Sequence, residues 1–221
     1  MRLDRPLVLT LLATLAALAL FAAAPGLDLA AAALFHDGTR FIGRTRAGEA
    51  ARMVFYVLPF LVIAGALALW LAGRMGWKRP RLSGAAALWL VLTMAAGPGV
   101  VVNLVLKDNT HRPRPAQVDV FGGKAAFRPV GRFDGACAKN CSFVSGEAAA
   151  AAWTLAPALL TPPPVRAGWV AASMIFAAAT GLLRMSFGGH FLSDVVLGVL
   201  FTVLIVLASR PFFLRRKPPS L

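Results

Sequence analysis

Residues 184–208 read RMSFGGHFLSDVVLGVLFTVLIVLA, a short polar turn that runs directly into a long apolar stretch. The turn ends in Gly188-Gly189-His190, and Asp194 follows four positions after the histidine. The run 191–208 is long enough to cross a membrane as a helix. An ionisable residue at the start of such a span is a functional hypothesis by default. We therefore expect a membrane helix with polar chemistry at its first turn.

The composition of the whole chain supports a membrane protein. Of 221 residues, 58% are hydrophobic and only 14% are charged, yet the net charge is +14. The mean hydropathy is +0.72, which lipid as solvent explains directly. The cations stand in short stretches between apolar runs, whereas a nucleic-acid binder gathers them on one polar face. We therefore expect membrane lipids as partners and no nucleic acid.

The apolar runs predict an all-α fold, a polytopic bundle of six transmembrane helices. The runs are 7–24, 53–72, 85–106, 145–160, 167–183 and 191–208. A spanning helix needs about 17–25 residues, so the fourth and fifth are short, and their ends should lie near the headgroups or inside the bundle. Residues 1–221 form one integral-membrane domain, with core motifs over 107–194 and a basic tail over 210–221.

The first span could instead be a cleaved signal peptide. Arg2 and Arg5 give it a basic start, and Ala22-Ala23-Ala24 resembles a cleavage site. The apolar run is long for a signal, however, and its removal would leave five helices, so we expect a retained helix.

The short loops set the expected orientation. The basic loop 73–82 and the basic tail favour the cytoplasm, which also places both termini there. The longer loops 25–52 and 107–144 then lie on the other side with the turn 184–190. In a bacterium this predicts an inner-membrane protein whose functional loops face the periplasm.

Cys137 and Cys141 lie in the loop 107–144, with three residues between them. An oxidising compartment favours a disulfide between them, and two unpaired thiols are the alternative that the sequence leaves open. Two thiols with no paired histidine nearby make a poor zinc site, so no metal is expected.

Three cations stand at predicted helix ends on the same side of the membrane: Lys107, Arg114 and Arg184. Arginine offers a planar fork to phosphate oxygens and lysine a point charge. Snorkelling at the interface explains most isolated cations in membrane proteins, but these three adjoin proline, Ser-Gly and Gly-Gly-His elements. Close to Lys107, Asp108 and Arg112 are also a candidate ion pair.

Two further elements complete the chemistry. Ser145-Gly146 precedes the fourth run, where a helix N-terminus favours anions, although a plain N-cap serine with Glu147 in the first turn is the simpler interpretation. His190 and Asp194 share one helix face, so the carboxylate could accept the proton of one ring nitrogen. The other nitrogen would then be free to attack phosphorus or take a proton. A purely structural pair is the alternative.

These segments resemble the type 2 phosphatidic acid phosphatase superfamily of membrane lipid phosphatases, which is marked by K-x6-R-P, P-S-G-H and S-R-x5-H-x3-D. The resemblance covers about half of the chain. It implies a six-helix bundle, a metal-independent reaction and a phosphohistidine intermediate. It also implies His190 as nucleophile with Asp194 as its partner. The phosphate cradle that it implies consists of Lys107, Arg114, Ser145, Gly146 and Arg184.

Three positions depart from the family pattern. Val144 replaces proline, which changes loop stiffness, and Leu183 replaces serine, which removes one hydrogen bond. Glu147 replaces the second histidine, which in the family protonates the leaving oxygen. Glutamate can do this in a dry pocket, but three nearby cations oppose it. His111 is a possible auxiliary donor.

The sequence therefore predicts a metal-independent, cofactor-free lipid phosphatase that acts on a periplasm-facing lipid. A lipid A-type phosphate is the favoured substrate, because the cysteine pair before the Ser-Gly motif and the small size resemble that branch. Undecaprenyl pyrophosphate and phosphatidylglycerol phosphate are alternatives. A non-catalytic lipid-phosphate binder or transporter is the alternative of another class. The oligomeric state stays open.

Overall fold

The computed structural model describes residues 4–77 and 82–214. The long helices are α1 (Arg5–Ala23), α3 (Arg46–Arg74), α4 (Gly84–Met94), α8 (Pro163–Ser186) and α9 (Leu192–Phe213). The short ones are α2 (Gly26–Ala33), α5 (Lys107–Asn109), α6 (Gly146–Trp153) and α7 (Leu155–Ala158). A π-helix, Ala95–Leu106, joins α4 to α5, and two 3₁₀ turns, Pro115–Gln117 and Asp119–Phe121, follow. The described ranges contain no extended β-strand, so the predicted all-α class is confirmed.

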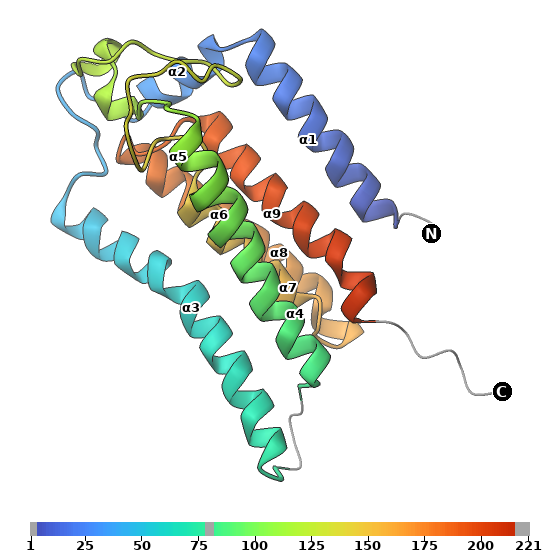
Figure 1. Cartoon of the computed structure of the whole chain (residues 1–221). Helices are drawn as coiled ribbons and strands as arrows, with labels where there is room; N and C mark the ends of the chain where they lie inside the picture. Colours follow the sequence, from blue (N-terminus) through green and yellow to red (C-terminus); the bar gives the residue numbers. More distant parts are fainter. Residues whose placement is uncertain (1–3, 78–81, 215–221) are drawn as a thin grey trace.

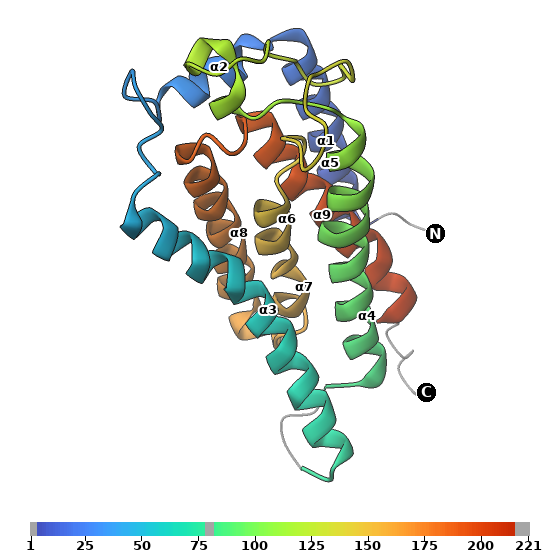
Figure 2. The same cartoon turned by 60° about the vertical axis from the view of Figure 1, so that its left-hand side comes forward.

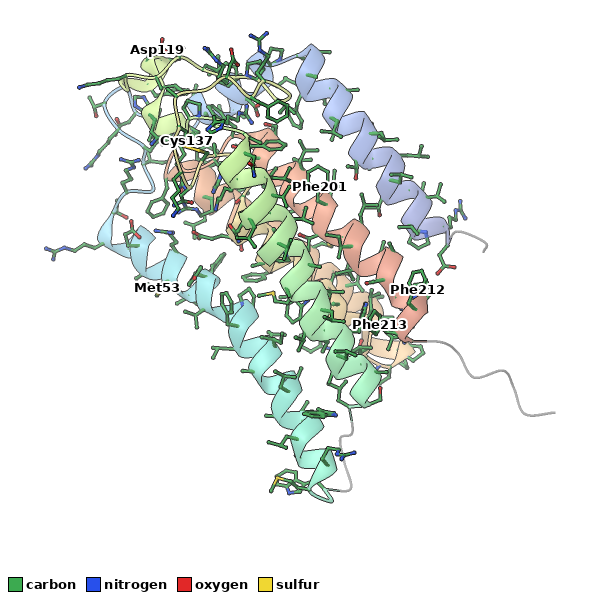
Figure 3. All side chains as sticks on the ribbon, viewed as in Figure 1. Met53, Asp119, Cys137, Phe201, Phe212 and Phe213 are labelled. Atoms are coloured by element: carbon green, nitrogen blue, oxygen red, sulfur yellow. A yellow bond between two sulfur atoms is a disulfide. The ribbon has the colours of Figure 1, made fainter. Side chains whose placement is uncertain are left out.

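The long helices place the functional loops at one end of the bundle (Figures 1 and 2). α2, the segment between α5 and α6, and the turn between α8 and α9 gather at that end. The start of α1, the end of α3 and the end of α9 lie at the other. α6 packs against α3, α8, α9 and the π-helix, whereas α1 packs along α9. Figure 3 shows Asp119 and Cys137 at the loop end and Phe212 and Phe213 at the opposite one.

Five helical segments in the described ranges are long and apolar enough to cross a membrane. They are α1, α3, α4 with the π-helix, α8 and α9. α8 has 24 residues, so the prediction that this span is short was wrong: Pro163 and Ser186 extend the helix beyond the apolar run. The run 145–160 instead forms α6 and α7, which break at Thr154 and are almost wholly buried. The predicted count of six spans is therefore not confirmed.

Hydroxyl side chains and proline explain where several helices begin and change pitch. Thr45, Ser83 and Ser145 cap α3, α4 and α6 by accepting a backbone N–H three residues on, at 3.0, 3.1 and 3.4 Å. Pro98 lies within the π-helix, and Asn103 Nδ2 donates to its carbonyl at 2.6 Å. A proline removes one helical donor, and wide π turns often lie near functional sites.

Hydrogen bonds pair polar side chains of α4, α6 and α9 inside the bundle, as a lipid environment favours. Trp153 Nε1 on α6 donates to Thr93 Oγ1 on α4 at 3.0 Å, and Thr93 Oγ1 donates to the carbonyl of Trp89 at 2.7 Å. Trp89 Nε1 in turn donates to Ser209 Oγ on α9 at 2.9 Å. Both tryptophans are fully buried. These bonds fix α4, α6 and α9 to one another.

Arg112 and the cysteines settle two questions that the sequence left open. Cys137 and Cys141 form a disulfide, so the two-thiol alternative is wrong. Arg112 makes ion pairs with Asp28 and Asp194, at 2.6 Å each. Its partners therefore come from α2 and α9, and not from its own segment as Asp108 suggested.

Close packing of α8 on α9 requires a glycine at position 181, and this generates a first prediction. A Cβ built on Gly181 would lie 2.2 Å from Val195 Cγ1, whereas a Cβ on Gly168 of the same helix meets nothing within 4 Å. Overpacking typically costs about 1–3 kcal/mol. We expect Gly181→Ala to lower the thermal unfolding temperature of the detergent-solubilised protein by several degrees. Gly168→Ala should leave it equal or raise it. Equal melting of both variants would contradict this packing.

Candidate functional site

The predicted phosphate-binding residues gather at the loop end of the bundle. A cavity of about 590 Å³ lies there, and its lining includes Arg44, Arg46, Arg52, Arg114, Arg184, Gly188 and Gly189. A second hollow of about 410 Å³ has Lys107, Gly146 and Glu147 in its wall. Sites for small molecules typically measure about 300–1,000 Å³, so the volume of the first cavity is that of a ligand site.

His190 lies between α8 and α9 with its side chain almost wholly buried. Its Nδ1 is 2.7 Å from the carbonyl oxygen of Ser142, which fixes Nδ1 as the protonated nitrogen. Burial, and then the positive charges of Arg114, Arg184 and Lys107, hold the pKa of His190 well below its usual range. With the proton on Nδ1, Nε2 keeps the free lone pair of the ring.

Asp194 is close to His190 but does not hydrogen-bond to it. Its Oδ2 is 4.0 Å from His190 Nδ1. That oxygen accepts from Ser142 Oγ and from the backbone N–H of Phe191, at 2.5 and 2.8 Å. The carboxylate therefore holds Ser142, and the carbonyl of Ser142 holds the imidazole. The i, i+4 spacing predicted the neighbourhood correctly but not this intervening residue.

Arg184 reaches the cavity from the last turn of α8. Its Nε is buried and has no hydrogen-bond partner among the described residues. A Cβ on Gly189 would lie 2.6 Å from its Nη2, so only glycine leaves the guanidinium in this place. The buried Nε of Arg184 lies 3.4 Å from Glu147 Oε1, and Arg184 forms part of the cavity wall.

The other two predicted cations are held by asparagine side chains. Arg114 Nη2 donates to the backbone oxygen and to Oδ1 of Asn140, both at 2.9 Å, and burial lowers its pKa. Lys107 Nζ donates to Asn103 Oδ1 at 3.2 Å. A Cβ on Gly146 would lie 3.3 Å from Lys107 Nζ, so this glycine gives the lysine its room.

Ser145 takes the simpler of its two predicted roles. Its side chain is fully buried and caps α6, and its backbone N–H donates to the carbonyl of Asp194 at 2.9 Å. It therefore joins the start of α6 to the start of α9. A phosphate contact of Ser145 stays a prediction.

Glu147 forms an ion pair that the sequence did not reveal. Its Oε1 accepts from Arg52 Nη2 at 2.9 Å, and Arg184 Nε lies 3.4 Å from the same oxygen. Arg52 comes from α3, 95 positions away along the chain. In this arrangement Glu147 is an acceptor between two guanidinium groups, which is a poor position from which to donate a proton.

His111, the predicted auxiliary donor, lies against the disulfide loop. Its Nδ1 is 2.9 Å from the backbone oxygen of Cys137, and its own carbonyl accepts from the N–H of Cys137. It is not among the residues that line the main cavity. The geometry gives His111 a role in holding the loop.

The first loop, which we define as residues 34–46 between α2 and the start of α3, contributes part of the cavity wall. Sequence reasoning missed this contribution. Gly43 N–H donates to the carbonyl of Ser186 at 2.8 Å, and Arg44 Nε donates to that of Phe187 at 3.0 Å. These bonds dock the loop on the turn before His190 and bring Arg44, Arg46 and Arg52 to the cavity. The only signal in the sequence was the run of cations before the second span.

The described residues contain no group of three or more histidine, cysteine or acidic side chains arranged to hold a metal ion. The charges that face the cavity are chiefly arginines, which suit a phosphate oxygen and not a cation.

Comparison with known proteins agrees with the predicted resemblance. Residues 86–218 match the PAP2 superfamily. A lipid A 4'-phosphatase of Rhizobium leguminosarum is 37% identical over 218 residues, covering 87% of this chain and 90% of that protein. One of Rhizobium etli is 35% identical, covering 87% and 81%. One of Francisella tularensis subsp. novicida is 38% identical over 134 residues, covering 60% of each chain. No solved structure gives a significant match.

The contact between Gly189 and Arg184 can be tested directly. Gly189→Ala should push the guanidinium from the cavity wall and weaken inhibition by inorganic phosphate by about tenfold, the size of one charge-assisted hydrogen bond. Folding should be preserved, because Arg184 has a flexible side chain. Gly65→Ala, whose Cβ meets nothing within 4 Å, is the control. Unchanged phosphate inhibition in Gly189→Ala would show that Arg184 does not contact the anion.

Proposed function

This chain belongs to the PAP2 superfamily and is a membrane phosphoric ester hydrolase, and we propose that it removes a phosphate monoester from a sugar of a lipid A-type glycolipid. The observation that carries the proposal is the buried His190, which the carbonyl of Ser142 holds at Nδ1 and which Lys107, Arg114 and Arg184 surround with positive charge. The names of the relatives support the substrate, since lipid A 4'-phosphatases match most of the chain.

The reaction that fits this geometry has two steps. His190 Nε2 attacks phosphorus, so that an N–P bond forms and the ester P–O bond breaks. Lys107, Arg114 and Arg184 stabilise the charge that develops on the phosphoryl oxygens. The backbone carbonyl of Ser142 accepts a hydrogen bond from Nδ1–H throughout and keeps the tautomer. Water then attacks the phosphohistidine, which releases inorganic phosphate and restores the neutral ring. No metal ion is needed for either step.

Glu147 has a different role in this proposal from the one that the family pattern suggested. Its ion pair with Arg52 and its place 3.4 Å from Arg184 support a task of holding the two arginines. The departing sugar oxygen then takes its proton from water. This same observation favours a second candidate function, hydrolysis of a pyrophosphate lipid. A phosphate leaving group hardly needs a general acid, whereas a sugar hydroxyl does.

The site belongs, in this proposal, on the periplasmic side of a bacterial inner membrane, with both termini in the cytoplasm. The disulfide near the site supports an oxidising compartment. Arg5, Arg74 and Arg210 lie at helix ends on the opposite side of the bundle, which supports a cytoplasmic location for that end.

A panel of substrates tests the proposed activity. Purified protein in detergent with EDTA should release phosphate from lipid A phosphorylated at the 4' position faster than from undecaprenyl pyrophosphate or phosphatidylglycerol phosphate. His190→Ala should reduce this rate by at least about 10³-fold, because the covalent path disappears. Preference for the pyrophosphate lipid would favour the second candidate, and binding without turnover a non-catalytic role. Activity that EDTA abolishes and one divalent ion restores would disprove metal independence.

The arginines of the first loop predict how the headgroup is recognised. One phosphate is satisfied by the three motif cations, so Arg44 and Arg46 face the rest of an anionic headgroup. Arg46→Gln should raise the KM for 4'-phosphorylated lipid A several-fold to tenfold, since one charge-assisted contact is lost, and leave kcat unchanged. A small phosphomonoester should be hydrolysed at the wild-type KM. Arg40→Gln removes a cation of the same loop that pairs with Asp37 and serves as the control. An equal KM increase for both substrates would refute this role.

A further inference from the structure

Three buried ionisable groups meet beside His190, and the family resemblance assigns a role to only one of them. Asp28 on α2, Arg112 in the segment after α5, and Asp194 on α9 are each no more than 1% exposed. Asp28 also lies outside the residues matched to the superfamily, which begin at position 86. We call these three residues the buried triad.

Arg112 divides its two terminal nitrogens between the carboxylates. Nη2 donates to Asp28 Oδ2 and Nη1 to Asp194 Oδ1, both at 2.6 Å. Its Nε donates to the backbone oxygen of Arg128 at 2.8 Å. The guanidinium carbon also lies 4.6 Å from the centre of the Phe191 ring, so packing fixes the plane of the fork.

The outer oxygens of the triad are satisfied as well. Asp28 accepts from the backbone N–H and from Oγ of Ser193, at 2.8 and 2.6 Å. Asp194 accepts from Ser142 Oγ, and the carbonyl of Ser142 contacts His190 Nδ1 at 2.7 Å. An unbroken series of contacts therefore runs from α2 to the imidazole.

The charges of the triad do not cancel. Two carboxylates and one guanidinium leave a net charge of −1, and Asp194 Oδ2 lies 4.0 Å from His190 Nδ1. If Arg112 paired with Asp194 alone, their two opposite charges would cancel. Because Asp28 pairs with the other terminal nitrogen of Arg112, the triad keeps one net negative charge near the histidine. Buried ion networks are a poor source of stability, which makes a second role for this one reasonable.

The proposed reaction needs such a charge. When Nε2 bonds to phosphorus, the ring keeps its Nδ1 proton and becomes a cationic imidazolium. Around it stand Lys107, Arg114 and Arg184, all positive and necessary for the phosphate. The only buried negative charge near this ring among the described groups comes from the triad, while Glu147 is paired with Arg52. Fixed charge of opposite sign stabilises charge that develops in a reaction.

We propose that Asp28, acting through Arg112, is a positioning residue for the reaction. It orients Asp194 and keeps the charge beside His190 negative, which favours the phosphohistidine. The proposal rests on the proposed phosphohistidine mechanism but not on the identity of the lipid. α2 thereby belongs to the catalytic apparatus of this chain, although it contributes no group that touches substrate.

A double-mutant cycle that removes the charges of the triad one at a time distinguishes this role from a structural one. Asp28→Asn makes the triad neutral and should lower kcat at least tenfold, with the inhibition constant of inorganic phosphate unchanged. Adding Arg112→Gln to Asp28→Asn returns the net charge to −1, so the double variant should have a kcat at least threefold higher than that of Asp28→Asn. A structural role predicts the opposite, a further loss. Asp134→Asn, which breaks an exposed ion pair with Arg132, is the matched control and should be neutral.

Two more variants keep the test decisive if Asp28→Asn does not fold. Ser193→Ala removes a hydroxyl that donates to Asp28 and accepts from Arg112 Nη1, without changing any charge, and Asp28→Glu keeps the charge. Both should retain kcat within about threefold, because the net charge of the triad beside His190 is unchanged. A larger loss of kcat in either variant overturns the proposal, as does the absence of recovery in the double variant.

A readout that needs no lipid separates this proposal from the proposed substrate. Phosphoramidate is a small phosphoryl donor: an N–P bond to His190 would form as its own P–N bond breaks and ammonia leaves. ³¹P NMR should show less phosphohistidine in Asp28→Asn than in the wild type. If lipid A is not hydrolysed but His190 is labelled in this order, the substrate is wrong and the positioning role stands. If wild-type His190 is not labelled, or both proteins label equally, the positioning role is wrong.

Discussion

A carboxylate buried at the start of a membrane helix persists only when donors surround it, and Asp194 collects them from two distant segments and from the start of its own helix. Arg112 comes from the segment after α5, Ser142 from the segment before α6, and the N–H of Phe191 from the start of α9 itself. The backbone of Asp194 also accepts from Ser145. Satisfying this one charge therefore fixes the three motif segments to one another, and the cations of the site take their places around them.

Small residues allow the helices around Asp194 to pack closely against one another. α6 is mostly alanine and almost wholly buried, and a Cβ on Gly198 of α9 would lie 2.9 Å from the carbonyl of Ser145. Without a hydrophobic force between helices in lipid, close backbone contact is what holds them together. The short helix α6 thus brings Gly146, its first residue, close to Lys107.

The first loop and α2 contribute residues around the site although they lie outside the part of the chain that carries the superfamily motifs. The loop docks on the turn before His190 and supplies arginines to the cavity wall. α2 supplies Asp28 to the buried triad. Both segments precede the residues matched to the superfamily. The two roles that we propose, substrate recognition and tuning of the histidine, therefore belong to a part of the chain that the motifs do not describe.

The sequence by itself determined the all-α class, most of the spans and the motif residues around His190, because apolar length and residue type are local properties. It did not distinguish an alanine-rich helix buried in protein from one facing lipid, since both are apolar, and so α6 was taken for a span. It also could not supply Asp28 or Arg52. Asp28 lies 84 positions from Arg112, and Arg52 lies 95 from Glu147, so only folding makes them neighbours. Spacing placed Asp194 beside His190, but the contact through Ser142 was decided by the tertiary structure, because buried polar atoms take whichever partners packing brings within reach.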